Sequence, residues 1–394
     1  MPGGPPRGPW QRDPAVRLFL WSRAAIWIGV LFSLIWFTPN PVRPPESPHD
    51  VGYAVDVWAR TDSSFFLGIA RSGYHAGPST AFYPLYPALV GGLGRVLGGH
   101  YVLAGVVISL AACLGAFVLL SRLGRVHIGA EATSRALLYL SFFPMTLFLQ
   151  AVYSESLYLL LALIAFSAAE QGRFRLAGVA TGAAMLTRSA GLALLPALGL
   201  IAWRSGRRRE AWIGLAIALL LFSLWPLWLW HSVGDPGAFV TAQRDWKRHL
   251  SPAGPVGGLW RGFHVALAGL HYLLGAGLPT APVGGAGSYA QIALENIEAF
   301  CFAVLFVFLA IVAWRTLGSA YGTFAVVSLC IPLSVPTQFR PLLSMPRFGL
   351  AIFPLFLALG VLGARRNLHA LLISCSALLL GIAIVQWARY EWVS

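Results

Sequence analysis

One acidic side chain, Asp62, lies in a setting that would suit a catalytic residue. The segment WARTDSSFFLGIARSGY (58–74) follows the first long apolar run and places Asp62 among aromatic and small residues. If residues 58–70 form a helix, Asp62 shares one face with Trp58 and Phe65. An ionised carboxylate on an apolar face is costly unless a cation pairs with it or water reaches it. Two interpretations therefore stand: a structural ion pair with an arginine of this or another loop, or a base at the mouth of a cavity.

Four more polar residues stand where apolar runs break. Arg340 and Arg347 flank PLLSMP, and a guanidinium fork matches phosphate oxygens, although arginines here could equally anchor in lipid headgroups. Arg188, in LTRSAG, lies between two short apolar runs, which suggests phosphate binding or an ion pair with Glu155. Glu155 follows Ser154 at the start of a run, where helix capping and the helix dipole would also explain an acid.

Two loop segments carry aromatic residues that could meet a substrate. GDPGAFVTAQRDWKRHLSP (234–252) mixes Trp246 with basic residues, and this composition favours anchoring in headgroups over binding a lipid-linked phosphate. FYPLYP (82–87) is stiffened by its prolines, so Tyr83 and Tyr86 either line a sugar site or belong to an interfacial aromatic belt.

The composition excludes a soluble protein. Of the 394 residues, 57% are hydrophobic and 11% charged, whereas soluble domains carry about 25% charged residues. The excess of 28 basic over 14 acidic residues is typical of topology signals in membrane proteins, and we expect no nucleic acid partner. Histidines and acids lack metal-ligand spacing, so we predict no cofactor and no structural metal. The cysteines all fall in apolar runs and are interpreted as core residues: Cys113, Cys301, Cys330 and Cys375.

The apolar runs predict an all-α polytopic membrane protein with one integral domain, 18–388. Residues 1–17 are rich in proline, glycine and arginine and are expected to be a disordered cytoplasmic segment, and 389–394 a short outer tail. Several runs are shorter than the ~20 residues of a perpendicular span, which suggests helices broken near a cavity. The eleven predicted spans are 18–38, 101–121, 134–151, 155–170, 174–187, 190–203, 210–233, 291–314, 319–336, 346–363 and 368–388.

Charge predicts the orientation of these spans. With the N-terminus in the cytoplasm, the basic connections, above all the cluster WRSGRRRE (203–210), fall on the inner side, as the positive-inside rule requires. The two long connections, 39–100 and 234–290, then face outward, and long loops in a compact protein are usually functional. This count treats 81–99 as an interfacial or re-entrant segment and not as a span.

Four segments in order resemble one family. They are WARTDSSFFLGIARSGY with the following FYPLYP, SFFPMTLFLQAVYSESLYLLL (141–161), MLTRSAGLALLP (185–196) and RPLLSMPRFGLAIFPLFLALG (340–360). Together they resemble the GPI mannosyltransferase 2 (PIG-V) family and its bacterial relatives, which are polytopic glycosyltransferases of the GT-C class. The family usually has a tryptophan directly before the aspartate, whereas this chain has Thr61.

The resemblance implies a GT-C-type bundle with interfacial helices in the first outer loop. It also implies inverting transfer of mannose from polyprenyl-phosphate mannose to a hydroxyl of a lipid-linked or cell-envelope acceptor, with Asp62 as general base. The reaction would take place on the outer face of a bacterial plasma membrane. The other candidates take two roles, donor phosphate binding by Arg347, Arg340 and Arg188, and positioning of acceptor or sugar by Glu155, Trp58, Tyr83 and Tyr86.

Two other functions remain open from the sequence. A GT-C enzyme for another lipid-linked sugar, such as glucose or arabinose, would share all these features. A lipid or solute transporter would also have many spans and intramembrane arginines, but the chain lacks the internal repeats of many transporters and carries an acid in its first outer loop.

Overall fold

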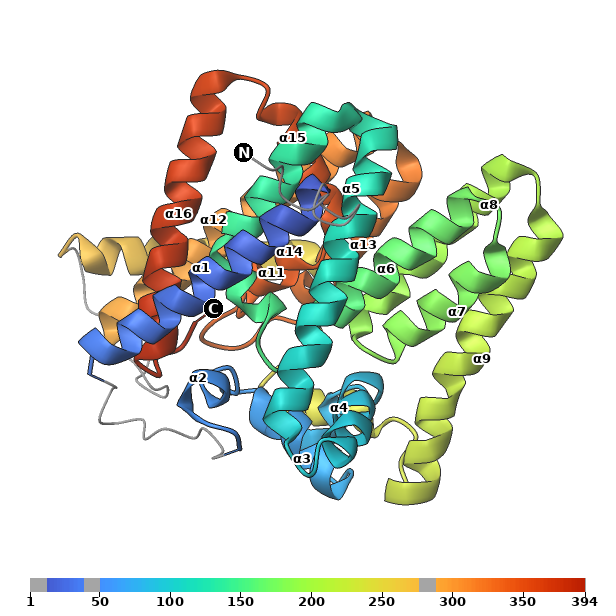
Figure 1. The fold of residues 1–394 in the computed structure, drawn as a ribbon, viewed down its shortest axis with the longest axis horizontal. Coiled ribbons are helices and arrows are strands. Elements are labelled where there is room, and N and C mark those ends of the chain that lie inside the picture. The colour runs from blue at the N-terminus through green and yellow to red at the C-terminus, as the bar shows by residue number, and fades with distance from the viewer. Residues whose placement is uncertain (1–12, 39–49, 276–287, 394) are drawn as a thin grey trace, which may run out of the picture.

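The computed structural model describes residues 13–38, 50–275 and 288–393, and these residues are helical almost throughout (Figure 1). Within them there is no β-strand, only an isolated antiparallel bridge between Arg248 and Thr337. The all-α prediction is confirmed. Most of the N-terminal segment expected to be disordered lies outside the described residues.

Five helices of the described chain are long and apolar enough to cross a membrane. They are α1 (Pro14–Trp36), α5 (Tyr101–Phe142), α9 (Arg208–Val233), α12 (Tyr289–Leu317) and α16 (Arg366–Ala388). The shorter helices between them are α6 (Glu155–Glu170), α7 (Phe174–Met185), α8 (Leu194–Ser205), α13 (Ser319–Leu333) and α15 (Phe353–Leu362). Their positions follow the predicted spans, while the predicted number of eleven is not confirmed.

Helix α5 departs from the prediction. The helix continues through the expected inner connection 122–133, and only Gly129, with a φ of 79°, breaks it. It ends at Phe142 because Pro144 cannot continue a helix and restricts the residue before it. A 3₁₀ turn, η3 (Pro144–Leu149), follows, fully buried. The predicted span 134–151 is therefore wrong, and its second half instead forms a buried turn that leads to α6.

The connection 234–290 contains a helix that the sequence analysis did not predict. This helix, α11 (Gly254–Leu273), buries small residues against its neighbours. A Cβ atom on Gly258 would lie 1.9 Å from the carbonyl oxygen of Leu333, and one on Gly269 would lie 3.1 Å from that of Ala293. Small side chains thus allow the backbones to approach closely, as in packed membrane helices.

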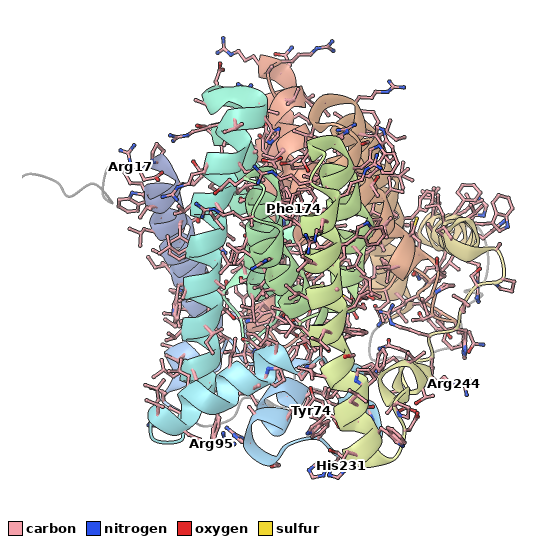
Figure 2. The ribbon with its side chains drawn as sticks, turned by 90° about the vertical axis from the view of Figure 1, so that its right-hand side faces the viewer. Arg17, Tyr74, Arg95, Phe174, His231 and Arg244 are labelled. Atoms are coloured by element: carbon pink, nitrogen blue, oxygen red, sulfur yellow. The ribbon has the colours of Figure 1, made fainter. Side chains whose placement is uncertain are left out.

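The two long connections meet at one end of the bundle. The first carries α2 (Tyr53–Asp56), α3 (Ser63–Ser72) and α4 (Leu85–Val96), which are grouped at the lower end of the bundle in Figure 1. Helix α4 has 12 residues, too few for a span. Figure 2 shows this end marked by Tyr74, Arg95, His231 and Arg244, with Arg17 toward the other.

The end of α16 packs on the first connection as well. The indole Nε1 of Trp387 donates to the carbonyl of Val57 at 3.0 Å, and the guanidinium of Arg60 lies over the ring of Tyr390. The C-terminal end of the described chain therefore packs against the first long connection. The remaining short elements are η2 (Pro78–Ala81), η4 (Ser189–Ala193), α10 (Ala238–Thr241), η5 (Ala242–Arg244) and α14 (Met345–Leu350).

Candidate active site

Asp62 lies at the start of a helix and not on its apolar face. Helix α3 begins at Ser63, and Asp62 is its N-cap residue. The preceding Thr61 has a φ of 47°, which ends any helical run from Trp58. The predicted helix 58–70 is therefore wrong in its first part, and Trp58 and Asp62 do not share a helix face.

Hydrogen bonds join the Asp62 loop to the start of α6. The backbone N–H of Val152 donates to the carbonyl of Trp58 at 3.0 Å, and the hydroxyl of Ser63 donates to the carbonyl of Val152 at 3.0 Å. The hydroxyl of Tyr153 donates to the carbonyl of Arg60 at 3.0 Å and also contacts the hydroxyl of Thr61. Segments about ninety residues apart are thereby fixed side by side.

Four charged side chains form one continuous network at this junction. Arg347 on α14 places Nη1 2.8 Å from Oδ2 of Asp62 and Nε 2.7 Å from Oε1 of Glu155. Arg188, between α7 and η4, places Nη1 2.7 Å from the same Oε1 and 3.2 Å from the hydroxyl of Ser154. The side chain of Glu155 is fully buried, whereas 16% of Asp62 is exposed. The network thus runs from a buried acid to one that solvent or substrate can reach.

Aromatic rings support the central arginine. The guanidinium carbon of Arg347 lies 5.2 Å from the centre of the Phe148 ring and 5.0 Å from that of Tyr153. Cation–π contacts of this kind stabilise a partly desolvated guanidinium. Burial raises the pKa of the Tyr153 hydroxyl, and the nearby carboxylate of Asp62 adds to the increase. Tyr153 therefore remains a neutral hydrogen-bond donor to the Asp62 loop.

A fifth charged residue approaches from the connection 234–290. The bridge to Thr337 fixes the backbone of Arg248, and its guanidinium carbon lies 5.6 Å from the centre of the Phe348 ring. The guanidinium carbon of Arg188 lies 5.8 Å from the same ring. The pKa of Arg248 is lowered to about 10, chiefly by burial and also by the charges of Arg347 and Arg188, while the charge of Asp62 opposes the decrease.

Backbone strain gathers around this site. Thr61, Lys247 and Ser344 have φ values of 47°, 54° and 64°, and each precedes a site residue by one to three positions. Residues other than glycine rarely adopt such values, and they persist where surrounding contacts enforce them. The strain is consistent with a site whose geometry is held against local preference.

The other predicted site residues lie elsewhere. Arg340 pairs with Glu295 of α12, with 2.9 Å between Nη2 and Oε2, and within the described residues no ion pair joins it to the network. Trp58 is buried, 5.3 Å from Trp27 between ring centres. Tyr86 is also buried, and its hydroxyl hydrogen-bonds to Ser109.

Tyr83 lies on the edge of a small second cluster, 6.1 Å from Phe239 between ring centres. The structure thus brings together Asp62, Glu155, Arg188 and Arg347, while Arg340, Trp58, Tyr83 and Tyr86 lie outside their network. Sequence reasoning missed Arg248 because nothing distinguishes it from the other basic residues of its loop. No group of three or more possible metal ligands occurs within 13–38, 50–275 and 288–393, and the absence of a structural metal stays a prediction.

The sequence resemblance is confirmed for part of the chain. The model of the family described as mannosyltransferase (PIG-V) matches residues 52–202. This region contains Asp62, Glu155 and Arg188, and it ends before Arg248 and Arg347. No curated protein sequence matches the chain.

Solved structures of two proteins are similar over most of the chain. ArnT from Cupriavidus metallidurans, bound to undecaprenyl phosphate, is 14% identical with a TM-score of 0.40, over 87% of this chain and 77% of that one. The oligosaccharyltransferase AglB from Archaeoglobus fulgidus, in complex with an inhibitory peptide and a dolichol-phosphate, is 14% identical with a TM-score of 0.42, over 95% and 56%. This chain therefore spans little more than half of that enzyme's length.

Proposed function

We propose, on the premise of its match to the mannosyltransferase (PIG-V) family, that this chain is an integral-membrane mannosyltransferase. Its donor is polyprenyl-phosphate mannose, and its acceptor is a hydroxyl of a lipid-linked or cell-envelope molecule. Five membrane-length apolar helices support the location in a membrane. The reaction takes place on the outer face of a plasma membrane, at the end of the bundle where the two long connections meet.

The observation that carries this proposal is the partly exposed carboxylate of Asp62 within a network of arginines. The ion pair with Arg347 uses Oδ2, and no ion pair or hydrogen bond within the described residues engages Oδ1. An ionised carboxylate with one available oxygen can accept a proton from a bound hydroxyl, and general-base help contributes about 10²–10⁴-fold to rate. Glu155 is fully buried by its two arginines, so it fits a positioning role better than that of the base.

The proposed step has three simultaneous parts. Asp62 takes the proton of the acceptor hydroxyl, and that oxygen forms a bond to the anomeric carbon of mannose. The bond between this carbon and the phosphate oxygen breaks, and its electron pair stays with the polyprenyl phosphate. Positive charge beside the leaving phosphate stabilises the charge that develops there. Attack opposite the leaving group inverts the configuration, so that a β-linked donor gives an α-mannoside.

A transfer assay tests the function. Purified protein in detergent is mixed with labelled polyprenyl-phosphate mannose and with lipid and glycan fractions of a cell envelope as acceptors. The proposal predicts a labelled α-mannoside. A product formed only from a glucosyl or arabinosyl donor would replace mannose by that sugar. Movement of the labelled lipid across vesicles without any glycosidic product would replace the enzyme by a transporter.

A further inference from the structure

The charges of the network balance one another. Two carboxylates, Asp62 and Glu155, face two guanidiniums, Arg188 and Arg347, with contacts of 2.7–2.8 Å. Each arginine of the network is already paired with an acid of this chain. A bound phosphate would therefore add a negative charge to a neutral set, and burying an uncompensated charge is costly.

Arg248 adds the missing positive charge. In the described ranges no carboxylate lies within ion-pair distance of its guanidinium. Its guanidinium lies over the ring of Phe348, the residue after Arg347. Arg188 lies over the same ring, so two arginines from distant segments border one aromatic side chain. With Arg248, the site holds three cations and two anions.

The backbone of this chain fixes Arg248 in place. Ser251 N–H donates to the carbonyl of Ser334 at 2.8 Å, and Arg248 N–H donates to the carbonyl of Gln243 at 3.2 Å. The left-handed φ of Lys247 turns the chain directly before Arg248. A partly buried cation close to other cations, held at a strained turn without an acid of its own, is unfavourable in the absence of an anion. The arrangement thus points to an anionic ligand.

We infer that Arg248 binds the phosphate of the lipid-linked donor and of the polyprenyl phosphate that leaves. This inference rests on the proposed function, and it identifies Arg248 as the residue that gives the donor-phosphate site its net positive charge. One uncompensated positive charge matches the single negative charge of a phosphodiester, which favours a monophosphate-linked over a diphosphate-linked sugar. When the bond to the anomeric carbon breaks, the phosphate gains negative charge, and Arg248 stabilises it there. Arg340, which pairs with Glu295, is not part of this site.

Substitution of Arg248 tests the inference through binding as well as activity. The probe is polyprenyl monophosphate without a sugar, whose equilibrium affinity is measured for the wild-type protein, Arg248→Gln, Arg248→Lys and Arg244→Gln. Arg244 is exposed on the same loop and provides the matched control (Figure 2). Loss of one charge-assisted hydrogen-bonding group predicts roughly 10- to 100-fold weaker binding for Arg248→Gln. Arg248→Lys should recover part of this loss, and Arg244→Gln should bind as the wild type does.

The outcomes separate this inference from the proposed function. Wild-type affinity in Arg248→Gln, with an unchanged KM for the donor, would overturn the role of Arg248 even if mannose transfer is observed. Equal losses in Arg248→Gln and Arg244→Gln would also overturn it, because they would indicate general attraction of the loop for anions. Failure of the wild-type protein to transfer any sugar would refute the proposed function, whatever the binding shows. A wild-type melting temperature for Arg248→Gln, measured together with Arg248→Lys, excludes misfolding as the cause of a change in affinity.

Discussion

Replacing Glu155 with glutamine tests the network that organises the site. The change keeps the shape of the side chain and removes its charge, which leaves Arg188 without its acid and Arg347 with Asp62 alone. Glu155 is fully buried, and its partners Arg188 and Arg347 are 14% and 11% exposed. Removing one partner of a buried ion pair costs about 3–5 kcal/mol. Because Arg347 keeps one acid, we expect a loss of about 3 kcal/mol in the free energy of unfolding.

The assay is denaturant unfolding in detergent, followed in wild type, Glu155→Gln, Arg188→Gln and the double variant. Side chains in direct contact should show a coupling energy, and values of about 0.5–3 kcal/mol are typical of such pairs. The double variant is therefore expected to lose less free energy of unfolding than the two single variants lose together. Turnover should fall in Glu155→Gln as well, since Arg347 holds both Glu155 and Asp62.

Glu131→Gln is the matched control for this experiment. Glu131 also pairs with an arginine, Arg135, at 2.6 Å, but it is 89% exposed. Exposed pairs contribute about 0–1 kcal/mol, so this variant should unfold almost as the wild type does. A loss in Glu155→Gln no larger than that in Glu131→Gln, with no coupling to Arg188, would refute the reasoning that a buried network organises the site.

Three further predictions concern the surroundings of the network. Thr61→Ser should keep turnover within about twofold of the wild type. Thr61→Gly relieves the backbone strain but removes the hydroxyl beside Tyr153, so turnover should fall by about tenfold. Equal turnover in the two variants would contradict a positioning role of Thr61. Arg340→Gln should leave the donor KM unchanged because Arg340 pairs with Glu295, and a large rise in KM would return Arg340 to the donor site. The pKa of Arg248 is lowered to about 10, so the affinity of the wild-type protein for polyprenyl phosphate should fall as pH rises through about 10. The affinity of Arg248→Gln should not show this fall. A parallel fall in both proteins would exclude Arg248 as the titrating group.

The sequence predicted several helices where an apolar run ended at charged residues, although α5 continues past Arg122 to Phe142. Helix α6 (Glu155–Glu170) begins and ends where expected. The prediction failed at 134–151, where hydropathy alone did not register that Pro144 ends the helix. It also missed α11, whose glycines lower its hydrophobicity but allow close packing against α12 and α13.

The candidate site was predictable in its residues more than in its contacts. Asp62, Glu155, Arg188 and Arg347 could be selected because charge is costly near apolar runs, and they do converge. The ion pair of Arg188 with Glu155 was one of the two interpretations that the sequence offered, and the structure shows it. The partners of Arg347 and Arg340 could not be predicted, because tertiary packing decides whether Arg340 meets Glu295 or a substrate. The strained turns could not be predicted either, since threonine, lysine and serine give no sequence signal for a left-handed φ.

Single-turnover transfer by Asp62→Asn tests the central claim most directly. Enzyme in excess over labelled polyprenyl-phosphate mannose, with saturating acceptor, measures the chemical step, and binding of polyprenyl phosphate is measured alongside. If Asp62 is the general base, the rate falls by about 10²–10⁴-fold while the lipid still binds. Transfer at a rate close to that of the wild type would contradict the assignment of Asp62 as the base.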